Sequence, residues 1–193
     1  VNDVFHKYKM IPSVIIAPQY DDKVDVIQAL KSKAININNK YQAMAIAQLP
    51  EDILYSEAIE KKAELNCVYP DVVLTYGKLK NSNDIDDHSS HLACLMASVD
   101  NKNAGVPYES PSNKILMAQA LVMKKDGIYK EVRLDEVTQA NLLNENGIST
   151  ALSRSNGFTH WGNRTSAFQP GGITDPKDMW IPAKRMFKYI SNT

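Results

Sequence analysis

The chain has 193 residues, of which 44% are hydrophobic and 23% charged, and its 22 basic residues balance its 22 acidic residues. Zero net charge argues against a basic nucleic-acid-binding module, and no apolar run approaches the roughly 18 residues needed to span a bilayer. Two cysteines, Cys67 and Cys94, are too few for a disulfide scaffold. The length suits one globular body that buries about 70% of the unfolded chain's surface.

Strand and helix patterns alternate through the first part of the chain. Apolar runs with short flanking turns predict buried strands over 13–17, 43–49 and 71–76. Between the first two runs, the residues that share one helical face are Val24, Ile27, Leu30 and Ala34. We expect Asp21 and Asp22 to begin this helix as cap and first-turn acid, and Ser56 to cap a second helix. The order predicts a βαβαβ unit with parallel strands.

The second part of the chain is less regular. The polar stretch 80–90 has the composition of a loop, and an amphipathic helix follows from Leu92 to Val99. Asp126-Gly127 predicts a hairpin turn, 135–143 a short helix and 149–153 a strand. The predicted fold class is α/β, with a mixed central sheet flanked by helices. Its βαβαβ half covers 1–79, and an α+β half of the same body covers 80–193.

The last helix carries apolar and basic residues on different faces. The apolar positions with helical spacing are Ala183, Met186, Phe187 and Ile190. The favoured interpretation is that this apolar face packs on the body while the basic face lies in solvent. The alternative, a stacking platform for single-stranded nucleic acid, agrees poorly with zero net charge.

The search for catalytic chemistry finds two weak candidates. His88 and His91, three residues apart and just after the acidic stretch 84–87, could share a cation in a small metal-dependent α/β hydrolase, but further ligands at motif spacing are missing. The alternative is a solvated loop with Ser89 or Ser90 as helix cap. Cys94 lies inside an apolar helix, where a free cysteine acts as a small hydrophobe. We therefore assign no catalytic, cofactor-binding or metal-binding residue.

Several short motifs, taken in order, resemble one protein family. The strongest is 157–165, which contains Trp161-Gly162-Asn163-Arg164-Thr165 and leads through 174–178 to the helix at 180–190. Weaker matches upstream lie at 16–22, 90–93, 106–114 and 142–148. Together they resemble the tail sheath proteins of contractile bacteriophages, in particular the P2-like group, along nearly the whole chain.

The resemblance implies a structural protein rather than an enzyme, with no cofactor. Sheath proteins polymerise as stacked hexameric rings around an inner tube and contract to drive that tube through a host cell envelope. The implied partners are other copies of the chain, the tail tube protein, and baseplate and tail-terminator proteins, with no nucleic acid or membrane. The implied location is the virion tail, made in the bacterial host cytoplasm. A related machine, such as a phage-tail-like bacteriocin, is the nearest alternative.

The resemblance also assigns roles to particular residues. Trp161, Gly162, Arg164 and Thr165 are the structural signature. We expect Gly162 to permit close backbone approach, Trp161 to anchor the core, and Arg164 to form an ion pair at the core edge or an intersubunit contact. Lys184, Arg185 and Lys188 are the candidate subunit interface. Because the chain starts at Val1 and stops at Thr193, we expect a truncated core that lacks the polymerisation arms and is monomeric alone.

Overall fold

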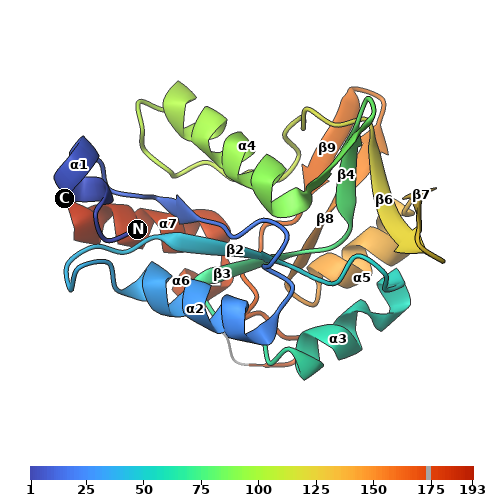
Figure 1. Ribbon diagram of the computed structural model, residues 1–193, viewed down its shortest axis with the longest axis horizontal. Coiled ribbons are helices and arrows are strands. Elements are labelled where there is room, and N and C mark those ends of the chain that lie inside the picture. The colour runs from blue at the N-terminus through green and yellow to red at the C-terminus, as the bar shows by residue number, and fades with distance from the viewer. Residues whose placement is uncertain (173–174) are drawn as a thin grey trace.

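A five-stranded sheet in the order β1-β2-β3-β8-β9 forms the centre of the computed structural model, which describes residues 1–172 and 175–193 (Figure 1). Its strands are β1 (Val14–Ile15), β2 (Met44–Gln48), β3 (Val72–Thr75), β8 (Ile148–Arg154) and β9 (Gly157–Trp161). The first four are parallel, and β9 runs antiparallel to β8. These pairings confirm the predicted α/β class, with its parallel βαβαβ unit and mixed sheet.

Both faces of the sheet are covered, which explains why all five residues of β2 are buried and the first four are apolar. Ala45 and Ala47 pack in one cluster with the buried face of helix α2 (Val24–Ile35). Met44 and Ile46 point to the opposite face, toward the helices α4 (His88–Lys102) and α7 (Ile181–Asn192).

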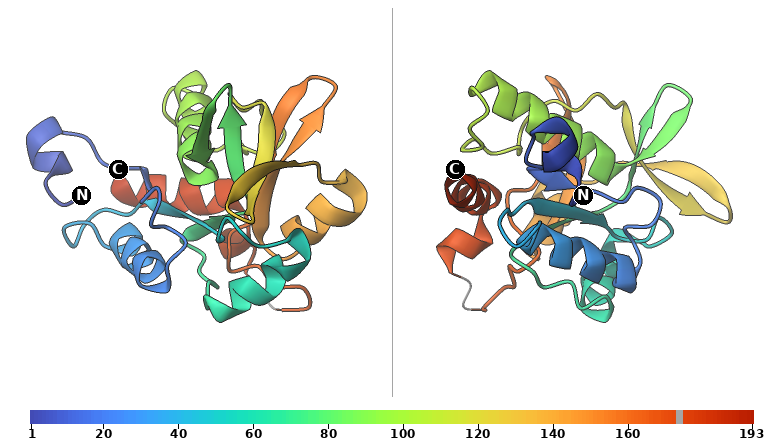
Figure 2. Two further views of the ribbon diagram at one scale, coloured as in Figure 1. Left: turned by 45° about the vertical axis from the view of Figure 1, so that its right-hand side comes forward. Right: turned by 60° about the vertical axis from the view of Figure 1, so that its left-hand side comes forward.

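A second, antiparallel sheet is inserted between β3 and β8, in the order β5-β4-β6-β7. Its strands are β4 (Lys78–Asn81), β5 (Asp84–Asp87), β6 (Ala120–Lys125) and β7 (Ile128–Val132). The predicted turn at Asp126-Gly127 is confirmed, with both residues at positive φ. The β8–β9 hairpin rises alongside this sheet (Figure 2).

The prediction of a loop over 80–90 is wrong. That stretch forms most of the β4–β5 hairpin and the first turn of α4. The hairpin is polar because much of its surface faces solvent. Besides β5, the strand β4 also pairs with β6, which is distant in the sequence. Ser89 and Ser90 therefore lie inside α4 rather than capping it.

Two further predicted caps are also wrong. The residue before α2 is Lys23, whose Nζ lies 3.0 Å from an oxygen of Asp22, and no side chain caps the helix. The helix expected from Ser56 begins instead with a 3₁₀ turn, where the Leu54 N–H donates to the Glu57 carboxylate at 2.8 Å. The remaining helical segments are α1 (Val4–Tyr8), η1 (Tyr55–Glu57), α3 (Ala58–Glu64), η2 (Glu136–Ala140), α5 (Asn141–Asn144) and α6 (Pro176–Met179).

Candidate functional site

Helix α7 is amphipathic as predicted, but it faces the opposite way. Arg185 and Lys188 are only 3% and 4% exposed, whereas Phe187 and Ile190 are 56% and 61% exposed. The predicted packed apolar face and solvated basic face are therefore wrong. The helical period determines which side chains share a face but not which face meets the protein.

Buried acids on other elements explain this orientation. Arg185 makes a two-pronged ion pair with Asp100 near the end of α4, in which Nη1 donates to Oδ1 at 2.9 Å. Lys188 Nζ lies 2.6 Å from the carboxylate of Asp71, the residue before β3. Lys184 Nζ donates to Asp178 Oδ1 at 2.7 Å. All three predicted interface residues are thus engaged within the chain, and a role for them between subunits stays a prediction.

Gly162 lies where the chain leaves β9, at a φ of +146° that side chains rarely adopt. A Cβ atom built on this glycine would lie 2.8 Å from the Cα of Ser149 in β8. The Gly162 N–H donates to Ser112 Oγ at 3.2 Å. The close backbone approach expected at this position is present.

Trp161 lies at the edge of the body, partly exposed, rather than anchoring the core as expected. Its indole Nε1 donates to Asn141 Oδ1 at 3.2 Å, and the guanidinium of Arg154 lies 4.5 Å from its ring centroid. The indole therefore connects β8 and β9 to the start of α5.

The guanidinium of Arg164 lies close to two aromatic rings, and it forms no ion pair with any residue that the structure describes; the alternative expectation, an intersubunit contact, stays a prediction. Its guanidinium carbon lies 4.0 Å from the ring centroid of Phe168 and 5.6 Å from that of Trp180. Thr165 is completely buried, and its hydroxyl donates to the Asp178 carbonyl at 2.5 Å. These two residues fasten the segment after β9 to α6. Thr174, which begins the 174–178 motif, lies outside the described residues.

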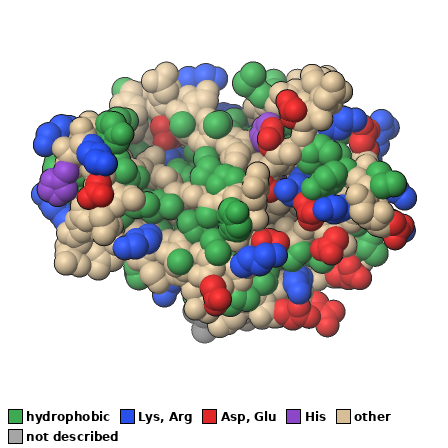
Figure 3. Space-filling view, viewed as in Figure 1, with side chains coloured by type: hydrophobic (Ala, Val, Ile, Leu, Met, Phe, Trp, Pro, Cys, Tyr) green, Lys and Arg blue, Asp and Glu red, His purple; other side chains and the backbone are tan. Residues whose placement is uncertain are grey.

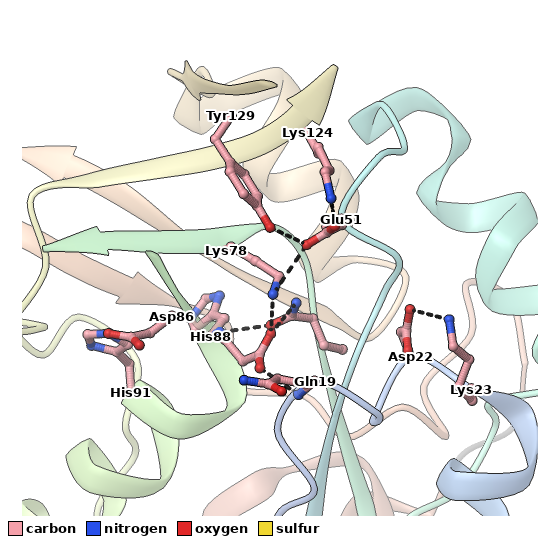
Figure 4. Close-up of polar contacts among 12 residues, drawn as sticks. Gln19, Asp22, Lys23, Glu51, Lys78, Asp86, His88, His91, Lys124 and Tyr129 are labelled. Atoms are coloured by element: carbon pink, nitrogen blue, oxygen red, sulfur yellow. Dashed lines mark hydrogen bonds and ion pairs between the residues drawn. The ribbon is translucent and has the colours of Figure 1, made fainter. Parts of the chain in front are cut away.

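A polar cleft of about 780 Å³ lies where β1 and β2 end, and sequence reasoning did not find it. Basic and acidic side chains are intermixed on the right of the face shown in Figure 3, and Glu51 contacts side chains of the second sheet across the cleft (Figure 4). The carboxylate of Glu51 accepts from Tyr129 Oη at 2.6 Å and Lys124 Nζ at 2.9 Å, and lies 3.2 Å from Lys78 Nζ. Although burial acts in the other direction, these donors lower the pKa of Glu51 to about 2.

Asp87, at the end of β5, is the second junction between the sheets. Its carboxylate accepts from the Gln19 N–H at 2.7 Å and from Gln48 Nε2 at 3.3 Å, and it lies 2.8 Å from Lys78 Nζ. Many side chains of the cleft, such as Asp21, Glu51 and Lys78, come from segments that follow β1, β2 and β3, and others come from α3 and the β6–β7 turn. Their position after parallel strands is the one sequence signal that could have indicated the cleft.

The two histidines of the metal hypothesis are engaged in separate contacts. His88 is completely buried, with Nδ1 3.3 Å from the Tyr76 carbonyl and Nε2 3.2 Å from His160 Nδ1. Burial lowers its pKa to about 4. His91 Nε2 lies 3.6 Å from Asp86 Oδ2. Cys94 is exposed on α4 rather than packed in the core.

Within residues 1–172 and 175–193, no three His, Cys, Asp or Glu side chains converge as a set that could hold a metal ion. In the same part of the chain, no helix is both long enough and apolar enough to cross a membrane. The hydrolase hypothesis therefore gains no ligand set from the geometry.

The same fold occurs in solved structures of contractile machines. A chain of the anti-feeding prophage baseplate matches 100% of this chain with a TM-score of 0.65 and 17% sequence identity. A chain of the PVC sheath complex, an extracellular contractile injection system in its contracted state, matches 99% with a TM-score of 0.69 and 19% identity. The sheath tail protein of Listeria innocua matches 93% with a TM-score of 0.55 and 13% identity.

The chain covers less than half of each of these proteins: 46% of the baseplate chain, 48% of the PVC chain and 36% of the Listeria protein. No protein-family model and no curated sequence matches it. At such low sequence identity, the similarity establishes a shared fold. It identifies this architecture as the one found in sheath proteins of contractile systems.

Proposed function

We propose that this chain is the folded body of a sheath subunit in a contractile injection machine. The observation that carries the proposal is the match of 99% of the chain to a chain of the PVC sheath complex at a TM-score of 0.69. The ordered sequence motifs support it independently, because they depend on the amino-acid sequence and not on the fold. The role is mechanical, with no enzymatic step.

The finer parts of the proposal rest on the family resemblance. Subunits stack as hexameric rings around a tube, meet baseplate and terminator proteins at the ends, and contract to drive the tube through a cell envelope. The machine is the tail of a virion, where contraction serves genome ejection, with a bacteriocin or other phage-tail-like injection system as the alternative. The flanking arms that link subunits are expected outside residues 1–193.

Electron microscopy of negatively stained samples tests this function. A longer version of the protein that includes flanking arms is expected to form striated tubes or sleeves, while the 193-residue chain gives single particles. Both samples should be compared over a range of salt concentrations, because surface charge pairs are screened by salt. Dispersed particles from the longer protein under every condition would contradict the sheath proposal.

The outer face of α7 is our candidate for a contact between subunits. Phe187 and Ile190 are more than half exposed there, while the basic residues Lys184, Arg185 and Lys188 hold the helix from behind through their ion pairs. Covering exposed aromatic and aliphatic side chains is a common source of association energy. The basic residues would then act on the interface by fixing the position of α7.

Replacing Phe187 and Ile190 together by Ser is expected to reduce the fraction of long-chain protein that sediments as tubes. The stability of the isolated chain should hardly change, because neither side chain is buried. Val137→Ser is the matched control, since Val137 is 74% exposed on a different element. Normal tube formation by the double variant would remove α7 from the interface.

A further inference from the structure

Asp21 is a buried acid on the loop between β1 and α2. Its side chain is 1% exposed, and its Oδ2 atom has no hydrogen-bond partner. Among the residues that the structure describes, no basic side chain forms an ion pair with it. An isolated buried carboxylate is costly unless a cation compensates it or it takes up a proton.

The groups around Asp21 come from several elements. Asp22 of the same loop and Asp87 of β5 add negative charge. Ser89, in the first turn of α4, contributes a buried hydroxyl beside Asp21. Burial lowers the pKa of the preceding residue, His88, to about 4, so its imidazole is neutral. Lys78 of β4 is already 2.8 Å from Asp87 and 3.2 Å from Glu51.

The charge of this junction therefore depends on a single proton. With Asp21 neutral, the carboxylates of Asp87 and Glu51 are balanced by Lys78 and Lys124, which all lie in one ion-pair network. Ionised Asp21 adds a third negative charge beside Asp87, away from water, and no cation accompanies it. Burial raises the pKa of Asp21 to about 6; the Ser89 hydroxyl opposes this shift, and Asp87 and Asp22 add to it.

We propose that Asp21 is a proton-operated latch that fastens the β1–α2 loop to the junction between the two sheets. The protonated latch is closed, and loss of the proton lets segment 19–23, which lines the polar cleft, move away from β5. Two hydrogen bonds donated by backbone amides report its state. The Gln19 N–H donates to Asp87 Oδ2 at 2.7 Å, and the Gln48 N–H donates to the Asp21 carbonyl at 3.1 Å.

The direction of the pH dependence follows from proton binding. A carboxyl that holds its proton more tightly in the closed state stabilises that state below pH 4, and the stabilisation is lost as the pH rises to about 6. With an ordinary carboxyl in the open state, opening should be about tenfold more frequent at pH 8 than at pH 5.

Amide hydrogen exchange on this chain tests the latch. After correction for the intrinsic exchange rate, the exchange rates of the Gln19 and Gln48 amides should be about tenfold higher at pH 8 than at pH 5. In Asp21→Asn, which is neutral at every pH and nearly isosteric, both amides should stay protected at both pH values. Asp22→Asn is the control and should weaken the pH dependence only slightly, because Asp22 is the smallest contributor to the shift, is partly exposed and is paired with Lys23.

A carbon-13 titration of the Asp21 carboxyl in the unaltered chain gives a second measurement that needs no variant. Titration near pH 6 is expected. An ordinary carboxyl titration, or the same pH dependence of exchange in Asp21→Asn, would overturn the latch. Both experiments use the chain without assembly, so their outcome is independent of the proposed sheath function.

Discussion

Arg185→Met should lower the free energy of unfolding by about 3–5 kcal/mol, because it leaves the buried carboxylate of Asp100 without its cation. Methionine retains most of the apolar stem, so the change mainly removes charge. Urea denaturation of the 193-residue chain at pH 7 measures the effect. Helix α7 should become the least protected of the long helices in hydrogen exchange.

Two further variants, a control and a double substitution, test whether the loss of stability comes from the buried ion pair. Lys177→Met removes the exposed pair between Lys177 and Asp175, and should leave the free energy of unfolding almost unchanged, because solvent screens exposed ion pairs. Combining Arg185→Met with Asp100→Leu should recover much of the loss, since apolar residues can replace a buried ion pair. A cost in Arg185→Met no larger than that of Lys177→Met would mean that the ion pair does not hold α7.

The second large effect is expected for Gly162→Ala, at about 3 kcal/mol or more of lost stability. The added methyl would lie 2.8 Å from the Ser149 Cα, a backbone atom that cannot move without disturbing β8. The φ of +146° adds strain for any residue with a side chain. Thermal unfolding followed by circular dichroism measures the loss.

Gly171→Ala separates the two causes of that loss. Gly171 also has a positive φ, +69°, but nothing lies within 4 Å of a Cβ built there. Its substitution should therefore cost only the conformational strain, about 1–2 kcal/mol. Equal losses at both positions would show that packing against Ser149 contributes little.

The parallel arrangement of β1, β2 and β3 could be predicted because these strands are mostly apolar, a pattern that depends only on local sequence. The β4–β5 hairpin could not, because its strands are polar and one of them completes its pairing with β6, far along the chain. For α7, the helical period predicted which residues share a face, but the prediction of which face packs against the protein was wrong. The acids that draw its basic face inward, Asp71 and Asp100, belong to other elements.

The same reasoning explains which residues a sequence can single out as candidates. Trp161 and its neighbours are consecutive, so a motif could identify them. The cleft gathers Asp21, Glu51, Lys78 and Asp87 from four separate segments, and nothing in the local sequence of any one indicates the others. Only the rule that parallel strands end at one edge connects them, and that rule gives a location without a chemical role.

The pairing of β3 with β8 has a consequence for synthesis on the ribosome. The β3 strand ends at Thr75, and its partner β8 begins only at Ile148, after the whole antiparallel sheet has been made. Until then the nascent chain exposes one edge of an apolar strand, which is a template for wrong pairing with other chains. We expect slow completion of this sheet to be the folding step at which chaperones matter.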